Sequence, residues 1–229
     1  MMKRTEREAK NATTFDEWAD RGRGVRMGEG HAHLVSAALD RIQVGEGEAL
    51  LDIGCGVGMA LEAAAARGAG PLYGVDVSEQ MVARCRARLP GAVIQQASGE
   101  ALGLPDECVH HVISIESLYY HHDPCETLAE AVRVLKPGGW FCTVIEFFHE
   151  NPGTHGWPDA VGVPMHCWST DRWEAVLESA GLVYVASDRV IHPDVPSEET
   201  FTPSSTFATF EAYASYRREG GLLLVGRKL

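Results

Sequence analysis

Alternating glycines follow a short apolar run that carries an acid near its end. The run Leu50–Ile53 contains Asp52 and leads directly into Gly54, Gly56 and Gly58, after which alanines predominate. This order predicts a buried strand, a tight turn and the start of a helix. Glycines suit such a turn because its backbone angles exclude most side chains, and because a ligand can then lie against bare backbone at the strand end. The stretch therefore indicates a site for a nucleotide-type ligand.

The spacing of these glycines separates the ligand classes. A dinucleotide fingerprint has its third glycine three residues after its second, and here that position holds Met59 or Leu61, depending on the frame. A phosphate-binding P-loop has Lys and then Ser or Thr after its last glycine, and Met59-Ala60 supplies neither. An acid two positions before the first alternating glycine instead resembles motif I of the class I S-adenosylmethionine-dependent methyltransferases. In that family the glycine backbone meets the methionine part of the cofactor, and the acid helps to hold its ammonium group.

Three further segments match this family in order and spacing, which weakens the alternative of a glycine turn used only for packing. The apolar run 71–76 ends in Asp76, about 20 residues beyond the glycines, where a carboxylate can bind ribose hydroxyls from the tip of a neighbouring parallel strand. Val77 would then pack on the adenine. The segment 133–139 resembles the turn before strand five of the family. Together the matches cover residues 50–147.

The third of these segments, at 99–105, resembles the family's Gly-Asp-Ala-x-x-Leu-Pro, in which the acid and the next backbone amide face the adenine edge. Glu100 replaces Asp here, so we expect the adenine contact from the backbone of Ala101 rather than from the carboxylate. The resemblance implies S-adenosylmethionine as the cofactor and S-adenosylhomocysteine as the product. The residues expected to bind the cofactor are Asp52, Gly54, Cys55, Gly56, Gly58, Asp76, Val77, Ser98, Gly99, Glu100, Ala101 and Glu116.

The residues after the strand predicted at 109–116 face the transferred methyl group in this family, and here they are rich in Tyr and His. Methyl transfer from a sulfonium is an in-line displacement with a good leaving group, so the enzyme mainly has to align the acceptor and exclude water. A histidine with its usual pKa of ~6.5 accepts a proton at neutral pH, which makes His121 the main candidate for a general base. Tyr120, His122 and Glu116 are the other catalytic candidates. The alternative is that these side chains only line the pocket.

An insert at 148–168 separates the last parallel strand from the helix predicted at 169–180. Loops over the carboxyl ends of strands set specificity, and the aromatic and His side chains of this insert suggest a flat or apolar acceptor. Four of its residues are soft metal ligands: His149, His155, His166 and Cys167. Their spacing matches no zinc pattern, so no metal site is predicted.

The N-terminal part is expected to form a lid over the cofactor, as helices in this position commonly do in methyltransferases of this size. Residues 1–14 are polar and are expected to fray or to form a loosely docked helix. Trp18, Met27 and His31 are the lid candidates, and an amphipathic helix is predicted after them at 32–42. Trp18 and Met27 are alternatively plain packing residues.

The composition is that of an ordinary soluble globular protein. The chain has 229 residues, 45% apolar and 23% charged, which is enough for one sizeable core and too little for two ordinary domains. A formal charge of −12 disfavours nucleic acid, whose binding rests on Lys and Arg neutralising phosphates. No run approaches the ~20 apolar residues of a membrane span, and the N-terminus lacks a hydrophobic stretch, so a cytoplasmic location is expected. The six cysteines lack Cys-x-x-Cys spacing, which fits reduced and mostly buried thiols.

The predicted fold is α/β, a Rossmann-like three-layer sandwich with a seven-stranded, mostly parallel sheet. The resemblance implies the strand order 3-2-1-4-5-7-6 with an antiparallel last strand. The closing strands are expected at 182–190 and 222–228 and should pair antiparallel. A helix predicted between them, at 204–218, is expected to fold back over the acceptor pocket or to supply a homodimer contact.

We expect a single domain over residues 1–229. Its parts are a helical lid at 1–44, a cofactor-binding core at 45–147, and an acceptor-site insert with the closing strands at 148–229. The function that this organisation favours is the transfer of a methyl group to a small-molecule acceptor. One alternative is a protein that binds S-adenosylmethionine or S-adenosylhomocysteine without methyl transfer. The other is a dinucleotide-dependent oxidoreductase, which the glycine spacing disfavours.

Overall fold

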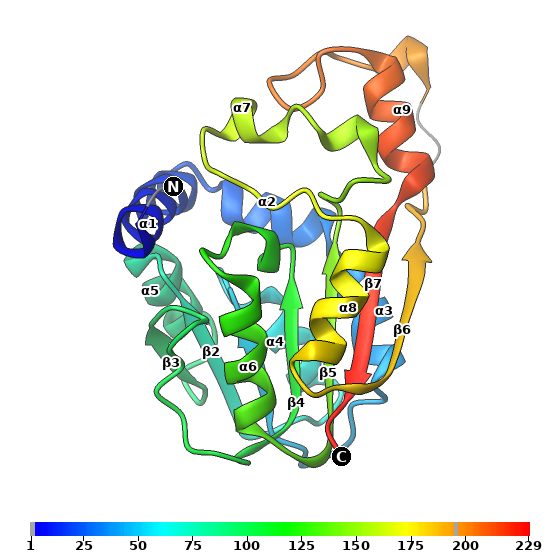
Figure 1. The fold of residues 1–229 in the computed structure, drawn as a ribbon. Helices are drawn as coiled ribbons and strands as arrows, with labels where there is room; N and C mark the ends of the chain where they lie inside the picture. The colour runs from blue at the N-terminus through cyan, green and yellow to red at the C-terminus, as the bar shows by residue number, and fades with distance from the viewer. Residues whose placement is uncertain (1–2, 195–196) are drawn as a thin grey trace.

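A seven-stranded sheet forms the centre of the computed structural model, which describes residues 3–194 and 197–229 (Figure 1). Its strands are β1 (Leu50–Ile53), β2 (Leu72–Asp76), β3 (Val93–Gln96), β4 (Val109–Ile115), β5 (Leu135–Ile145), β6 (Val183–Val190) and β7 (Gly221–Arg227). Their spatial order is β3-β2-β1-β4-β5-β7-β6. Strand β7 runs antiparallel to both of its neighbours, whereas the pairs from β3 to β5 are parallel. The predicted fold class and strand order are confirmed.

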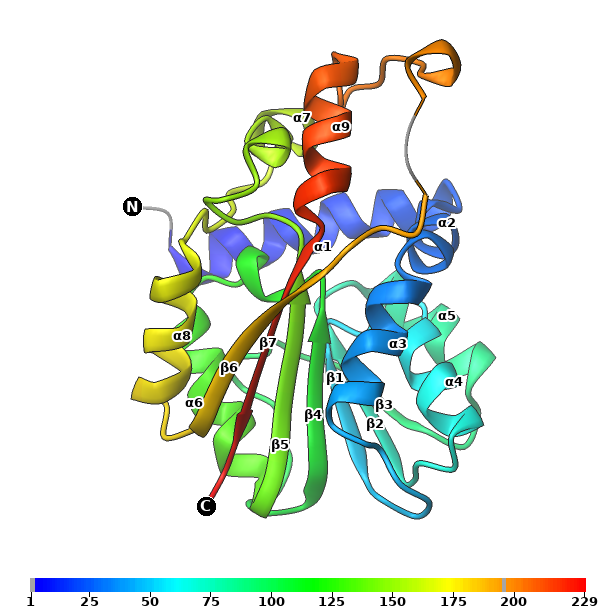
Figure 2. The ribbon, with the colours of Figure 1, turned by 90° about the vertical axis from the view of Figure 1, so that its right-hand side faces the viewer.

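Helices cover both faces of this sheet (Figure 2). The α-helices are α1 (Arg4–Asp20), α2 (Arg23–Gly30), α3 (Ala32–Arg41), α4 (Met59–Ala66), α5 (Glu79–Arg88), α6 (Pro124–Val134), α7 (Trp157–Val161), α8 (Thr170–Ser179) and α9 (Phe210–Glu219). Short 3-10 turns are η1 (Leu118–Tyr120), η2 (Pro152–Thr154) and η3 (Glu198–Thr200). Alternate strand residues point to opposite faces, so Leu50 packs into the core under α3, α4 and α5, while Leu51 packs into the core under α6 and α8.

The helices α1 and α2 lie across the carboxyl ends of the parallel strands (Figure 2). Helix α1 is firmly docked, so the expectation that residues 1–14 fray or dock loosely is wrong for its described part. The reason is that polar side chains of α1 are buried by hydrogen bonding rather than by apolar packing. Arg7 Nε and Asn11 Nδ2 each donate to the carbonyl oxygen of Tyr120 at 3.0 Å, which satisfies donors and acceptor together.

The helix α2 forms in a stretch whose Gly content gave no helix signal, because Gly is a poor helix former. Packing against the glycine turn outweighs that preference. A Cβ atom at Gly24 would lie 3.0 Å from Met81 Cε, and one at Gly28 would overlap the Met59 side chain. The glycines therefore let the lid helix lie close to the first turns of both α4 and α5. The side chain of Met27, one of the lid candidates, lies outside the described part of the chain.

The insert at 148–168 and helix α9 lie together beyond the carboxyl ends of the strands (Figure 1). A Cβ atom at Gly153 would lie 2.6 Å from the backbone nitrogen of Tyr216, so the two segments are in close backbone contact. Helix α9 begins at Phe210, later than the predicted start at 204. The side chain of Thr209 caps it by accepting a 3.2 Å hydrogen bond from a backbone amide of its first turn, which fixes the start there.

Two adjacent histidines at the start of β4, which the sequence left unexplained, have structural roles. The backbone amide of Ala49 donates to His110 Nδ1 at 2.9 Å, and His111 Nε2 lies 2.8 Å from Glu48 Oε2. Both contacts join the beginning of β4 to the loop before β1. Because they lie at the amino ends of these strands, they are far from the glycine turn.

All six cysteines are free thiols in the structure, and they are less buried than expected. Cys55, Cys85 and Cys142 are buried, whereas Cys125 and Cys167 are exposed. The exposed pair lies at the start of α6 and in the insert, where the sequence pattern had suggested core positions. Within residues 3–194 and 197–229, no helix is long and apolar enough to cross a membrane.

Candidate functional site

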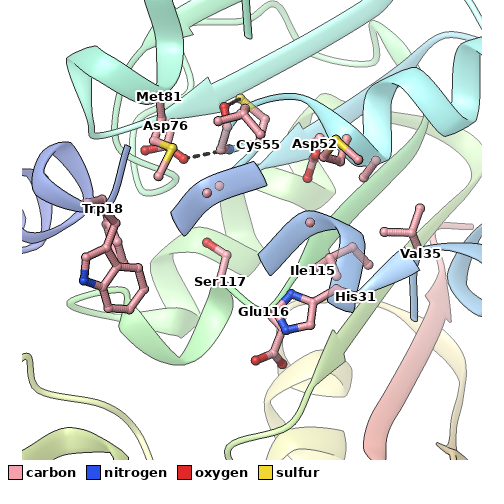
Figure 3. A pocket seen from close by; sticks show the side chains of 18 of the residues that line it. Trp18, His31, Val35, Asp52, Cys55, Asp76, Met81, Ile115, Glu116 and Ser117 are labelled. Carbon is pink, nitrogen blue, oxygen red and sulfur yellow. Dashed lines mark hydrogen bonds between the residues drawn. The ribbon is translucent and has the colours of Figure 1, made fainter. Parts of the chain in front are cut away.

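Residues of the glycine turn line a cavity at the carboxyl ends of β1 and β2, which we call the glycine-turn cavity (Figure 3). Figure 3 shows Asp52 and Asp76 on one side of it, with Ser117, Glu116 and His31 facing them across the cavity. Helix α2 contributes to the wall. The predicted cofactor-binding residues that line it are Asp52, Gly54, Cys55, Gly56, Asp76 and Glu116.

The three glycines of the turn have different reasons to be glycine. Gly56 has a φ of +51°, and a Cβ atom there would meet nothing within 4 Å, so its bare backbone faces the cavity. A Cβ atom at Gly54 would overlap the side chain of Ser117. A Cβ atom at Gly58 would lie 2.7 Å from Cys85 Sγ. Gly58 therefore serves helix packing, while Gly56 gives a ligand access to backbone.

Asp52 presents a buried carboxyl group to the glycine-turn cavity. The residue is 2% exposed, and its Oδ1 has no hydrogen-bond partner within the described residues. Burial, together with nearby Asp76, raises the pKa of Asp52 to about 8. An unpartnered buried oxygen of this kind calls for a ligand, and an ammonium group fits it by charge and by hydrogen bonding.

Asp76 holds the turn together at the tip of β2. Its Oδ2 accepts from the backbone amide of Gly56, and its Oδ1 accepts from the backbone amide of Ser78, each at 2.9 Å. Burial raises the pKa of Asp76, against the effect of these amide donors. The carboxylate therefore fixes both the glycine turn and the start of α5 while it lines the cavity.

A second cavity, the Ser98 cavity, adjoins the first. It is lined by Val77, Ser98, Gly99, Glu100 and both predicted histidines, His121 and His122. Gly54, Asp76, Ser117 and Tyr120 belong to both cavities. The two cavities thus form one continuous site along the carboxyl ends of β1, β2 and β3.

Glu100 and Ala101 are already hydrogen-bonded within the protein. Glu100 Oε1 accepts from the backbone amide of Asp123 at 2.9 Å, and Arg4 Nε lies 3.0 Å from its Oε2. The amide of Ala101 donates to the carbonyl of Ser98 at 3.1 Å. An adenine contact from the Ala101 amide, as expected from the sequence, would have to compete with this bond.

His121 is enclosed among hydroxyl groups rather than aimed into open space. Its Nδ1 lies 2.9 Å from Thr127 Oγ1 and its Nε2 3.2 Å from Ser117 Oγ. Burial, with smaller contributions from Arg7 and His166, lowers the pKa of His121 to about 4. The imidazole is therefore uncharged at neutral pH and is a weak base.

A third cavity, the aromatic cavity, lies between the ends of β4 and β5 and the segments α7 and α9. Its walls include the rings of Tyr119, Trp157 and Tyr216, and its floor carries the carboxyl groups of Glu116 and Glu146. The rings of Trp157 and Tyr216 have centroids 5.7 Å apart. Trp157 belongs to the insert whose aromatic side chains had suggested an acceptor site, and Tyr119 belongs to the Tyr- and His-rich stretch after β4. Glu146 and Tyr216 were not singled out from the sequence.

Four residues line both the glycine-turn cavity and the aromatic cavity: Trp18, His31, Glu116 and Tyr120. Trp18 and His31 come from the lid segment, as expected, and Glu116 and Tyr120 from the region after β4. Tyr120 also lines the Ser98 cavity. Two of the catalytic candidates therefore lie where the cavities join, while His121 and His122 do not line the aromatic cavity.

The two floor carboxyls have opposite charge preferences. Tyr119 donates from its hydroxyl to Glu116 Oε2 at 2.7 Å. Burial and the nearby charge of Glu146 raise the pKa of Glu116 to about 8. Burial alone would raise the pKa of Glu146 as well, but His192 and His31 beside it lower that pKa to about 2. Glu146 ends β5 as Glu116 ends β4, so an acid at a strand end was the sequence signal for it.

The insert brings together three of its four soft ligands. Donor atoms of His149, His155 and Cys167 lie within 4.8 Å of one another on the exposed surface. His166 lies elsewhere, with its Nε2 2.9 Å from the carbonyl oxygen of His121. Their sequence spacing had matched no zinc pattern, because loop folding rather than a fixed repeat brings them together.

Comparison with known proteins identifies the family that the chain resembles. The family model described as a methyltransferase domain matches residues 51–143. The ubiquinone/menaquinone biosynthesis C-methyltransferase of Acidiphilium cryptum is 31% identical over 190 residues, which cover 77% of this chain and 71% of that protein. A methyltransferase solved in complex with the Haloferax volcanii Trm112 methyltransferase activator is 35% identical, with a TM-score of 0.85. That match covers 93% of this chain and 96% of the other.

Another relative shares only the central region. A 37.1 kDa protein of transposon Tn4556 from Streptomyces fradiae is 37% identical over 109 residues. The alignment covers 45% of this chain and spans about a third of that protein, 32%. The similarity to that relative is therefore confined to about a third of its length.

Proposed function

The chain belongs to the class I S-adenosylmethionine-dependent methyltransferases of the ubiquinone/menaquinone C-methyltransferase type, and on that premise we propose that it methylates a small-molecule acceptor bound in the aromatic cavity. One observation carries the proposal: the glycine-turn cavity and the aromatic cavity share Trp18, His31, Glu116 and Tyr120. These four residues would hold the cofactor's methyl group and the acceptor side by side and keep bulk water out.

The cofactor, S-adenosylmethionine, supplies a methyl group activated on a sulfonium when it is bound. We assign its ammonium group to Asp52, supported by the unpartnered buried Oδ1. Asp76 is the proposed ribose ligand, supported by its position at the tip of β2 between the two adjoining cavities. Val77, Ser98 and Gly99, which line the Ser98 cavity, are the proposed neighbours of the adenine.

Alignment of the acceptor and exclusion of water are the main tasks left to the protein. The rings of Tyr119, Trp157 and Tyr216 suit a flat or apolar acceptor, because aromatic walls bury apolar area and stack on flat rings. Glu116 is proposed to hold a polar group of the acceptor beside the methyl group. These side chains would have to hold the acceptor atom in line with the bond that breaks.

The proposal is tested by binding and turnover together. Calorimetric titration with S-adenosylmethionine, S-adenosylhomocysteine and NAD measures the cofactor preference, and methyl transfer is assayed against a library of small metabolites. Once an acceptor is found, Trp157→Ala should raise its KM about tenfold or more, since a buried aromatic contact is lost. Trp140→Ala, within β5 and outside all three cavities, is the matched control and should leave KM unchanged.

Other outcomes would favour the alternatives. Binding of S-adenosylmethionine without turnover on any acceptor would favour a protein that binds the cofactor but transfers no methyl group. Preferential binding of NAD would favour the oxidoreductase, against the glycine spacing. A Trp157→Ala variant with wild-type KM would remove the aromatic cavity as the acceptor site.

A protein partner is a second proposal, independent of the acceptor. The Haloferax volcanii relative was solved with the Trm112 methyltransferase activator, and it resembles this chain over 93% of its length. We propose that a small activator protein of this type also binds here. Co-expression with a Trm112-type protein followed by gel filtration should give a stable heterodimer, and separate elution would contradict the proposal. A homodimer, the other partner predicted from the sequence, is distinguished by its mass in the same experiment.

A further inference from the structure

A group of metal-ligating side chains lies beside the floor of the aromatic cavity: His33, Glu146 and His192. They come from the first turn of α3, the residue after β5 and the stretch after β6. One ring nitrogen of each histidine and a carboxylate oxygen of Glu146 lie within 4.8 Å of one another. We propose that these three residues bind a divalent transition-metal ion, and that Zn²⁺ fits the ligand set best.

Burial separates this group from an ordinary surface cluster. The side chain of Glu146 is 0% exposed and that of His192 is 2% exposed. Ionisable groups removed from water to this degree are normally paired or bound to metals, because an isolated buried charge is costly. The Glu146 carboxylate already has His192 beside it, and a metal ion shared by both side chains would compensate the same buried charge.

Three ring nitrogens in the group have no hydrogen-bond partner among the described residues: His33 Nε2, His192 Nδ1 and His192 Nε2. His192 Nε2 lies 2.7 Å from Glu146 Oε1 as an ion pair, a contact that a bound ion would replace. The buried ring nitrogens without any such contact among the described residues are His33 Nε2 and His192 Nδ1. Buried nitrogens without partners are rare in folded proteins and commonly mark an ion or an ordered water.

The surrounding contacts orient the ligands as outer-shell contacts of a metal site do. The His33 ring hydrogen-bonds the carbonyl of Gly30, which leaves its unpartnered Nε2 as the ligand atom. Tyr216 donates from its hydroxyl to both oxygens of Glu146, each at 2.9 Å. Metal-bound histidines usually donate their second nitrogen to a carbonyl, and ligating carboxylates are usually hydrogen-bonded in turn.

The ligand types select the ion. Two imidazoles and one carboxylate occur in catalytic zinc sites, which keep a further position open for water or substrate, and imidazole suits Zn²⁺ and its first-row neighbours. Mg²⁺ and Ca²⁺ prefer oxygen ligands alone. An ion here would join α3, β5 and the stretch after β6. Since Glu146 also lines the aromatic cavity, the ion would lie next to the acceptor.

The exposed cluster of His149, His155 and Cys167 competes for the same ions and supplies the control. Its sulfur ligand distinguishes it from the buried group. Bound to Co²⁺, a thiolate gives an intense sulfur-to-metal charge-transfer band in the near ultraviolet, whereas two imidazoles and a carboxylate give only weak visible bands.

The experiment uses the full chain after removal of metal with a chelator. Zn²⁺ binding is measured by calorimetry, and the Co²⁺ form is examined by absorption spectroscopy. We expect a Zn²⁺ equivalent that survives in Cys167→Ser and is lost in His192→Ala and in Glu146→Gln. Tyr216→Phe should weaken this equivalent about 10- to 100-fold, the usual effect of losing an outer-shell partner. The measurement needs no turnover, so it stands whether or not the proposed acceptor is correct.

Two results would overturn the metal site. One is the absence of Zn²⁺ binding by the wild-type protein. The other is a single equivalent that Cys167→Ser abolishes, accompanied by a sulfur-to-cobalt band in the wild-type protein. The Co²⁺ spectrum of the wild-type protein decides between the two clusters even if His192→Ala fails to fold.

Discussion

The backbone amide of Gly56 donates a hydrogen bond to Asp76 Oδ2 across 2.9 Å, so the glycine turn after β1 is tied to the tip of β2. The other oxygen of the same carboxylate accepts from the amide of Ser78, which opens α5. The Asp76 side chain thus holds together two segments that shape the cavity: the turn after β1 and the start of α5. Changes at Asp76 should therefore affect both the ligand contact and the turn.

Asp76→Ala should weaken S-adenosylmethionine binding about tenfold or more. The variant loses hydrogen bonds to a charged group, which are worth roughly 1.5 to 3 kcal/mol. Asp76→Asn keeps one acceptor oxygen and should recover part of the loss. Calorimetric titration measures the dissociation constant, and circular dichroism checks the fold. A folded Asp76→Ala variant with the wild-type constant would show that Asp76 does not contact the ribose.

Gly56→Val should abolish measurable S-adenosylmethionine binding. The valine would occupy the space that Gly56 leaves open and would strain a backbone with φ of +51°. Gly162→Val is a matched control, because Gly162 also has a positive φ, +77°, and an open Cβ position but lines none of the three cavities described above. Binding should persist in the control. Retained binding by Gly56→Val would mean that the cofactor does not lie on this turn.

Binding of S-adenosylhomocysteine should release a proton near neutral pH. The pKa of Asp52 is about 8 in the free protein, so its carboxyl is mostly protonated at pH 7, and a bound ammonium group favours the ionised form. Affinity should rise with pH towards that value. Calorimetry at one pH in buffers of different ionisation enthalpy measures the release. Asp52→Asn should release no proton, and a wild-type enthalpy that is independent of the buffer would contradict the role of Asp52.

His121→Ala should change turnover by less than the 10² to 10⁴ that general base catalysis typically contributes. The pKa of His121 is about 4 because the ring is buried, so the ring has little proton affinity at neutral pH. The pH profile of the wild-type rate should lack an inflection near the ordinary histidine pKa, and the profile of the variant should look the same. Steady-state kinetics across neutral pH test this. A loss in the full range with unchanged S-adenosylmethionine affinity would restore His121 as the base.

Hydrogen exchange should slow in the covering segments when S-adenosylhomocysteine binds. These segments are α1, α2, the insert at 148–168 and α9, which cover a site that must open for exchange of ligands. Mass spectrometry of the free and bound protein measures the change. Helix α8 packs on the opposite side of the sheet from α3 and serves as the internal reference. Equal protection of α2 with and without ligand would argue against a lid.

The sequence by itself determined the cofactor half of the molecule. Asp52, Gly56 and Asp76 each stand at the carboxyl end of a strand, and parallel strands bring those ends to one edge of the sheet. Short-range pattern was therefore enough to predict the glycine turn and the acids beside it, whereas the strand order followed from the family resemblance that these motifs carry. The lid position of Trp18 and His31 followed from family resemblance rather than from pattern.

Only the tertiary structure decided the aromatic cavity, the proposed acceptor site. Glu146, Trp157, Tyr216 and His192 lie on separate segments with no fixed spacing, and long-range packing brings them together. The same packing turned His121 towards Thr127 and Ser117 and buried polar residues of α1 against loop carbonyls. Strand ends are placed by a regular backbone ladder that repeats along the sheet, whereas loops and lids are placed by individual side-chain contacts. For this reason the glycine turn could be predicted from local sequence patterns, whereas the aromatic cavity could not.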